Sequence, residues 1–152
     1  MKTSINYLLS ILLLSIFSTV ALAADPDIYS HKKKGAIKGA DAVAYFSLKE
    51  GDKYVKGSDE FTHEWNGATW KFSSQENLDK FSANPEQYAP QYGGYCAFAV
   101  SHNFTKPTNP DAWRIVDGKL YLNLSKGVQK KWLKDVPGNI ARADKNWPSV
   151  LN

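Results

Sequence analysis

The chain has 152 residues, of which 43% are hydrophobic and 13% aromatic, enough for one domain with its own core. Its formal net charge of +4 is mild, and the lysines are scattered apart from Lys32-Lys33-Lys34. Without a basic stripe, no nucleic-acid partner is expected. The only cysteine is Cys96, which excludes an internal disulfide, so stability has to come from packing.

Residues 1–23 have the features of a cleaved export signal. Lys2 supplies positive charge, an apolar run extends from Tyr7 to Val20, and Ala21-Leu22-Ala23 fits a small-x-small cleavage site. The apolar core is short for a membrane span, and polar residues follow it at once. The sequence predicts a periplasmic or secreted protein with no transmembrane segment in the mature chain. A retained N-terminal anchor is the alternative.

Residues 24–36 are polar, rich in lysine and without periodicity, which predicts a flexible tail. The domain itself is expected over residues 37–151. Val43–Phe46 is its first strand candidate, and the turn-like segment Lys49–Lys53 ends that strand.

The clearest local signal is a hairpin over Phe61–Phe72. Asn66-Gly67 is the preferred pair for a two-residue type I′ turn, because both positions need a positive φ. In the register that this turn sets, the facing pairs are Trp65 and Ala68, His63 and Trp70, and Phe61 and Phe72. The alternation places these side chains on one aromatic face, and His63 lies within it.

A helix is predicted to follow this hairpin. Ser73 and Glu76 have the spacing of a capping box, in which each side chain satisfies a backbone N–H at the helix start. The helix is expected from Ser74 to about Ala83, and Asn84-Pro85 ends it.

A second hairpin is predicted over Ala112–Leu124, turned at Asp117-Gly118. Its register pairs Ile115 with Leu120 and Trp113 with Leu122, which gives another apolar face. The helices expected after it run from a cap at Ser125 to Lys134 and, after an interruption at Pro137-Gly138, over Asn139–Asn146. These patterns predict a single α+β domain, in which two antiparallel hairpins form a small sheet packed with three to four short helices.

The segment Tyr88–His102 holds the strongest candidate for chemistry, Cys96. Gly93-Gly94 can bend the chain into a helix start with Cys96 in its first turn, where N–H groups and the helix dipole stabilise a thiolate. Cys96 is equally suited to burial as a small hydrophobic residue, enclosed by its aromatic neighbours. The candidate pocket residues around this turn are Tyr88, Tyr92 and Tyr95.

Metal ligation is a third possibility for Cys96. Its partners would be His63 and His102, since cysteine with histidine suits copper or zinc. Six residues separate Cys96 from His102, so they can meet only if the intervening helix ends near Ser101. His63 could instead form a thiolate–imidazolium pair with Cys96, or be an ordinary core residue. His31 lies among the lysines, where it is expected to be solvated.

The ordered motifs resemble a known family. The pattern from Trp65-Asn-Gly through Trp70-x-Phe72 and Phe81 to Pro85-x-x-Tyr88 resembles the core of a YHS domain. Further motifs resemble the exported bacterial YHS-domain (seleno)proteins, namely Tyr92-Gly-Gly-Tyr-Cys-Ala, Val116-Asp-Gly-Lys-Leu-Tyr-Leu-Asn and Asn146-Trp-Pro. The resemblance covers most of Ile37–Leu151.

This resemblance implies two things about the site. Metal-handling YHS domains have cysteines at the positions of Ser73 and Asn77, and neither residue here supplies a thiolate to a soft metal. Some relatives carry selenocysteine, at the position that we match to Cys96, which implies redox or nucleophilic use. Near the start, Gly39–Phe46 departs from the family by having alanines where it tends to have Tyr and Pro.

Two functions therefore stay open. The first is a small periplasmic protein with one functional thiol, used in redox chemistry or in copper-like metal binding, with a small molecule, a metal ion or a redox protein as partner. The second is a non-catalytic interaction or ligand-binding module with a structural Cys96. The sequence leans away from an enzyme, because no motif places a hydrolytic serine or aspartate.

Overall fold

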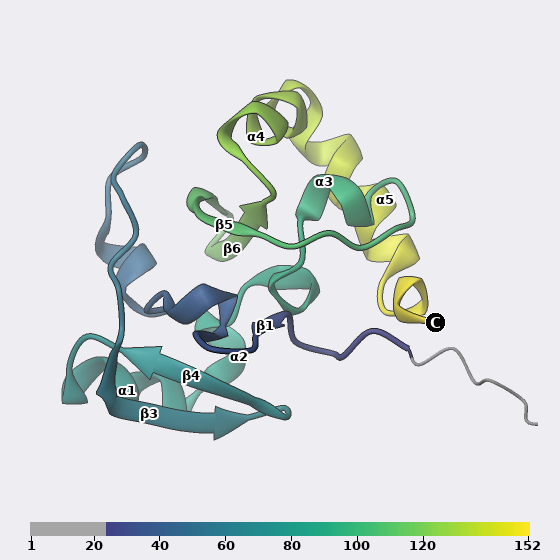
Figure 1. The fold of residues 1–152 in the computed structure, drawn as a ribbon. Coiled ribbons are helices and arrows are strands. Elements are labelled where there is room, and N and C mark those ends of the chain that lie inside the picture. The colour runs from purple at the N-terminus through teal and green to yellow at the C-terminus, as the bar shows by residue number, and fades with distance from the viewer. Residues whose placement is uncertain (1–23) are drawn as a thin grey trace, which may run out of the picture.

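The computed structural model describes residues 24–152 and shows an α+β fold (Figure 1). Residues 1–23, for which the sequence predicts an export signal, lie outside the described residues. In the described part of the chain, no helix has the length and apolar character needed to cross a membrane.

The strands are β1 (Ser30–His31), β2 (Gly35–Ala36), β3 (Ser58–Trp65), β4 (Ala68–Phe72), β5 (Asn109–Val116) and β6 (Lys119–Asn123). The α-helices are α1 (Gln75–Ala83), α2 (Pro85–Tyr88), α3 (Ala97–Val100), α4 (Lys126–Trp132) and α5 (Val136–Asn146). Short 3₁₀ turns are η1 (Ile37–Gly39), η2 (Ala44–Ser47), η3 (Gln91–Gly94), η4 (Leu133–Asp135) and η5 (Ser149–Leu151).

The two predicted hairpins are present as β3–β4 and β5–β6, each a two-stranded antiparallel sheet of its own. They do not share one sheet. A third such sheet in the described residues, β1–β2, lies in the segment where the sequence predicts a tail. Figure 1 shows β3–β4 with α1 in one half of the molecule, and β5–β6 with α3, α4 and α5 in the other.

Most of the predicted register of β3–β4 is confirmed. His63 faces Trp70, as expected from the Asn66-Gly67 turn, and Trp65 faces Ala68. The predicted pairing of Phe61 with Phe72 is wrong, because β3 has a bulge between Ser58 and Thr62 that brings Ser58 opposite Phe72. A bulge inserts extra residues into one strand, so a register counted from the turn fails beyond it.

The register predicted for β5–β6 is confirmed near its turn. Trp113 faces Leu122, and Ile115 faces Leu120. Here too an irregularity follows, since Asn109 is the next residue to pair, with Asn123. Both tight turns have the expected backbone, because Asn66 and Asp117 each have a positive φ before a glycine.

Two helix starts differ from the prediction. The N-cap of α1 is Ser74, whose side chain accepts a hydrogen bond from the Asn77 N–H, so the expected capping box of Ser73 and Glu76 is wrong. Helix α5 begins at Val136 and includes Pro137, because proline fits the first turn of a helix, where its missing N–H has no partner to lose. The expectation of a strand at Val43–Phe46 is wrong, because Val43 is the N-cap of the 3₁₀ turn η2 and the next three residues lie within that turn.

Residues 24–36, predicted as a flexible tail, are packed against the domain. Ile28 and Ala36 are buried in the core. The Asp25 N–H donates to the Leu151 carbonyl, and the Tyr29 N–H donates to the Gly93 carbonyl. The segment therefore bridges both halves of the fold, and the expected domain start at residue 37 lies inside the packed structure.

The interior consists of two aromatic clusters. In the first, which lies between β3–β4 and α1, the Phe81 ring is 4.9 Å from the Trp70 ring and 5.0 Å from the Phe72 ring, measured between centroids. In the second, between β6 and α4, the Tyr121 and Trp132 rings are 5.4 Å apart. Aromatic rings at such distances contribute beyond their buried area, which suits a protein without a disulfide.

Candidate functional site

Cys96 is enclosed by the protein. It is the N-cap residue of α3, and 1% of its surface is exposed. Its Sγ lies 3.7 Å from Oδ1 of Asn123, to which the thiol can donate a hydrogen bond, and its backbone N–H donates to the Lys106 carbonyl. The predicted helix start beside the Gly93-Gly94 bend is present, but it lies in the interior.

Burial raises the pKa of the Cys96 thiol. Backbone N–H groups near it, those of Ala99, Leu124 and Phe98, act in the opposite direction and offset this effect only in part. Helix α3 has four residues, so it adds little dipole at the sulfur. A reactive thiolate requires a lowered pKa and access to solvent, whereas this site favours a neutral thiol.

We expect native Cys96 to react with iodoacetamide at least about tenfold more slowly than a cysteine in a short peptide, and at the peptide's rate once urea unfolds the chain. Because burial raises the pKa of this thiol above that of a free cysteine, its rate should still be rising at pH values where the peptide's rate has levelled off. Mass spectrometry of the intact protein gives the time course. A native rate equal to that of the peptide, or a plateau below pH 8, would contradict a buried neutral thiol.

The two candidate partners of Cys96 lie elsewhere. His63 is on β3, where its ring meets the Phe81 ring edge-on at 6.1 Å between centroids, so it belongs to the aromatic face that the sequence predicts. His102 is exposed, its ring packs on Phe98 at 4.4 Å, and its Nδ1 lies 2.8 Å from the Phe98 carbonyl oxygen. Figure 1 shows β3 and α3 in different halves of the fold.

Within residues 24–152, no three side chains of histidine, cysteine, aspartate or glutamate lie together in a way that could hold a metal ion. The Cys96 thiol faces an amide oxygen, and His63 faces a phenyl ring. The described side chains thus do not form the copper or zinc site considered from the sequence.

The candidate tyrosines have separate roles. Tyr92 is buried, and its hydroxyl donates to Oδ1 of Asp144 at 2.8 Å; burial and then this hydrogen bond raise its pKa. The Tyr95 hydroxyl donates to the Pro26 carbonyl, and burial is the main cause that raises its pKa to about 12. Tyr88 packs edge-on against Phe46 at 5.4 Å between ring centroids. The raised pKa values keep the Tyr92 and Tyr95 hydroxyls protonated at neutral pH. Of the three tyrosines, Tyr92 alone lines the cleft described next.

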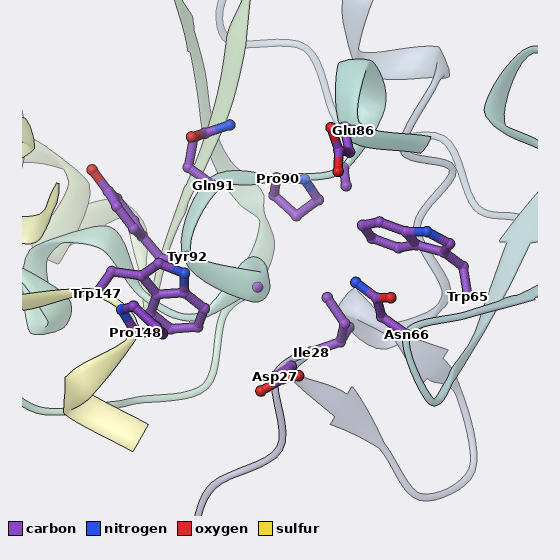
Figure 2. Close-up of a pocket in the computed structure, with 12 residues that line it drawn as sticks. Asp27, Ile28, Trp65, Asn66, Glu86, Pro90, Gln91, Tyr92, Trp147 and Pro148 are labelled. Carbon is purple, nitrogen blue, oxygen red and sulfur yellow. The ribbon is translucent and has the colours of Figure 1, made fainter. Parts of the chain in front are cut away.

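A cleft of about 500 Å³ opens where the two halves of the fold meet. Figure 2 shows Trp65 and Trp147 on opposite sides of it, each with its indole ring directed towards the middle. Trp65 ends β3 and belongs to the first aromatic cluster, whereas Trp147 follows α5 and packs with the second. Both are partly exposed, so their rings are available to a ligand.

The charged side chains that line the cleft are both carboxylates. Glu86 and Asp27 lie at opposite ends of it in Figure 2, and each is exposed. The remaining lining is neutral and comes mainly from the segment Ala89–Gly93. The cleft therefore combines aromatic faces with negative charge, which suits a cationic ligand.

Sequence reasoning found Tyr92 but missed the two tryptophans as site residues. Trp65 and Trp147 are 82 positions apart, and each fits a core pattern, so nothing in their spacing indicates that they face the same cleft.

The sequence profile of the YHS domain matches residues 51–92. A YHS domain is present in this chain. No curated protein and no solved structure gives a significant match. The YHS domain comprises β3, β4, α1 and α2 and ends at Tyr92, so Cys96 lies outside it.

The cleft lies along the border of this YHS domain. Trp65, Glu86 and Tyr92 belong to the matched residues, whereas Asp27 and Trp147 come from the segments before and after them. Clefts at such borders are common binding sites, because surfaces of different elements converge there.

The two YHS positions that hold cysteines in metal-handling relatives have another use in this chain. Ser73 donates from both its backbone N–H (2.8 Å) and its hydroxyl (2.6 Å) to Oδ2 of Asp41, and the Asn77 amide donates to the same oxygen at 2.8 Å. Oδ1 of Asp41 accepts from the N–H groups of Val43 and Ala44.

This carboxylate is fully buried and its acceptor sites are occupied by protein donors. A hydroxyl and an amide are also poor ligands for soft metals, so these residues do not fit the metal site of those relatives. They form instead a structural network around Asp41.

Proposed function

We propose that this protein is a non-catalytic ligand-binding module built on a YHS domain, with the cleft between Trp65 and Trp147 as its ligand site. The observation that carries the proposal is that two indole rings from different halves of the fold face one cleft whose only charged lining groups in the described residues are carboxylates. The ligand class that this lining favours is a small organic cation, such as a quaternary ammonium group.

The physical basis is the attraction of a cation to the face of an indole ring, which is strongest for tryptophan among the aromatic residues. The carboxylates at both ends of the cleft attract a cation. Because both are exposed, their side chains do not impose one binding geometry on the ligand. At exposed sites such a contact is worth about 0.5–1 kcal/mol, so two of them with two carboxylates support millimolar rather than nanomolar binding.

In this proposal Cys96 is a structural residue. Its support is the enclosure of the thiol, its contact with Asn123 and the upward shift of its pKa. The competing proposal, a redox thiol or copper ligand, draws on the family resemblance, and it would need a native thiol that reacts readily or a histidine at the sulfur.

We also propose that the protein acts in the periplasm or outside the cell. The support is the sequence of residues 1–23, with its charged start, apolar run and small-x-small site. An interaction with a small molecule, rather than with nucleic acid, agrees with the mild net charge of +4.

The test is a titration with choline, followed by NMR through the indole N–H signals. We expect the signals of Trp65 and Trp147, assigned with phenylalanine variants, to shift in a saturable way. The neutral analogue 3,3-dimethylbutan-1-ol has the same shape without the charge, and it should bind at least about threefold more weakly. Glu86→Gln should weaken choline binding about twofold to threefold, because one of two carboxylates is lost.

Glu60→Gln is the matched control, since Glu60 is an exposed glutamate on β3 outside the cleft lining. It should leave choline binding unchanged. Equal binding of the alcohol and of choline, or an equal effect of both glutamine variants, would refute a cation site in this cleft.

A further inference from the structure

A second cavity, of about 580 Å³, has a lining of the opposite charge. Its five lysines are Lys33, Lys34, Lys38, Lys56 and Lys71. They come from four parts of the chain: the turn between β1 and β2, the 3₁₀ turn η1, the segment before β3, and β4. The fold thus brings together cations that are scattered in the sequence.

The backbone beneath these lysines is held by two glycines. The Gly57 N–H donates to the Gly39 carbonyl at 2.9 Å. A Cβ on Gly57 would lie 2.4 Å from the Lys71 carbonyl carbon, and Gly39 has a φ of +79°, so neither position accommodates a larger residue without strain. The lysine backbones are therefore fixed close together, while their long side chains can adjust to a ligand.

The charge of this lysine cavity is not neutralised by the protein. Its one carboxylate, Asp59, pairs with Lys71. In the described part of the chain, the other four lysines form no ion pair. Five lysines and one aspartate give the lining a net charge of +4, as large as the formal charge of the whole chain. Like charges held in one cavity repel each other, and a bound anion relieves that repulsion.

A neighbouring cavity of about 290 Å³ extends this surface. It shares Lys33, Asp59 and Lys71 with the lysine cavity, and it adds the hydroxyl-bearing residues Thr62 and Thr69. Hydroxyl and ammonium groups are both hydrogen-bond donors to phosphate oxygens. The combined surface is longer than one phosphate group needs.

We propose that the lysine cavity binds a ligand that carries several phosphate groups. Four unpaired ammonium groups match more than one anionic charge, and lysine binds phosphate as a mobile point charge without requiring the planar geometry of arginine. The phosphates can belong to a free oligophosphate or to a lipid headgroup. This site is separate from the tryptophan cleft and does not depend on the function proposed for it.

The first arm of the test is calorimetric titration of the folded protein with tripolyphosphate at low salt. We expect saturable binding that weakens as the salt concentration rises. The variant Lys38→Gln/Lys56→Gln should lower the association constant at least about tenfold, because it removes two of the unpaired cations. Glutamine at position 38 meets the same positive φ as lysine, so the change adds no backbone strain.

Lys119→Gln/Lys145→Gln is the charge-matched control, since both lysines are exposed and lie outside the lysine cavity. It should change the constant less than about twofold. The second arm measures co-sedimentation with phosphatidylcholine vesicles that contain phosphatidylinositol bisphosphate, compared with phosphatidylcholine alone, and shows whether a lipid headgroup carries the phosphates. The proposal fails if neither probe binds, or if the control variant weakens binding as much as Lys38→Gln/Lys56→Gln does.

Discussion

Replacing Asp41 by asparagine is expected to lower the free energy of unfolding by about 3 kcal/mol, the largest effect that we predict for a single polar side chain. The carboxylate is fully buried and accepts five hydrogen bonds from Val43, Ala44, Ser73 and Asn77. Asparagine replaces one acceptor oxygen by an NH₂ group, which would face donors and leave them without partners.

The network matters because it joins distant parts of the chain. Asp41 holds the start of η2 on one side and, on the other, Ser73 just before α1 and Asn77 in its first turn, 32 and 36 positions later. Ser73→Ala should cost only about 1–2 kcal/mol, because the backbone N–H of residue 73 and the Asn77 amide still donate to the carboxylate.

Urea unfolding followed by tryptophan fluorescence measures these differences. Asp59→Asn is the matched control, since Asp59 is exposed and pairs only with Lys71 at the surface, and it should leave the free energy of unfolding nearly unchanged. A loss below about 1 kcal/mol for Asp41→Asn would show that the network does not hold these segments together.

Gly93→Ala is expected to be the most damaging change at a glycine, with a loss of at least about 3 kcal/mol. Gly93 has a φ of +59°, which costs a residue with a side chain about 1 kcal/mol. Its Cβ would also lie 1.9 Å from the Asp27 carbonyl oxygen, so the backbone of the N-terminal segment has to move. That segment is held by the hydrogen bond from the Tyr29 N–H to the Gly93 carbonyl, which this movement would break.

Gly118→Ala separates the two causes of this loss. Gly118 has a φ of +72°, and nothing lies within 4 Å of where its Cβ would be, so the variant should show only the backbone cost of about 1 kcal/mol. Thermal and urea unfolding of both variants measure the difference. Equal losses would mean that the close approach of Asp27 and Gly93 has no energetic consequence.

The parts of the fold that depend on neighbours in the sequence were predictable. Asn66-Gly67 and Asp117-Gly118 determine tight turns, because their preferred φ values favour one turn type, and the registers next to those turns are confirmed. Ser125 caps α4 as expected, because the cap needs only an N–H three residues away, that of Val128. For α1 the same reasoning predicted Ser73 in the capping box instead of Ser74, because either of the two adjacent serines fits the local pattern of an N-cap.

The arrangement of the sites was decided by tertiary structure. The spacing around Cys96 is compatible with an exposed, a buried or a metal-bound thiol, and burial against Asn123, 27 positions later, favours the neutral thiol. Ser73 does not cap α1, because its hydroxyl donates instead to the carboxylate of Asp41, 32 positions earlier.

The positions of the charged and aromatic sites also depend on the tertiary structure. By itself, the sequence determined that the protein has an α+β architecture with two hairpins, a YHS core and a single cysteine. Only the packing of the two halves brings Trp65 to face Trp147, and only the β1–β2 turn folded beside β4 gathers Lys33 with Lys71. Local patterns report which face of an element is apolar, whereas a site depends on which faces meet, and that is set by packing between residues far apart in the chain.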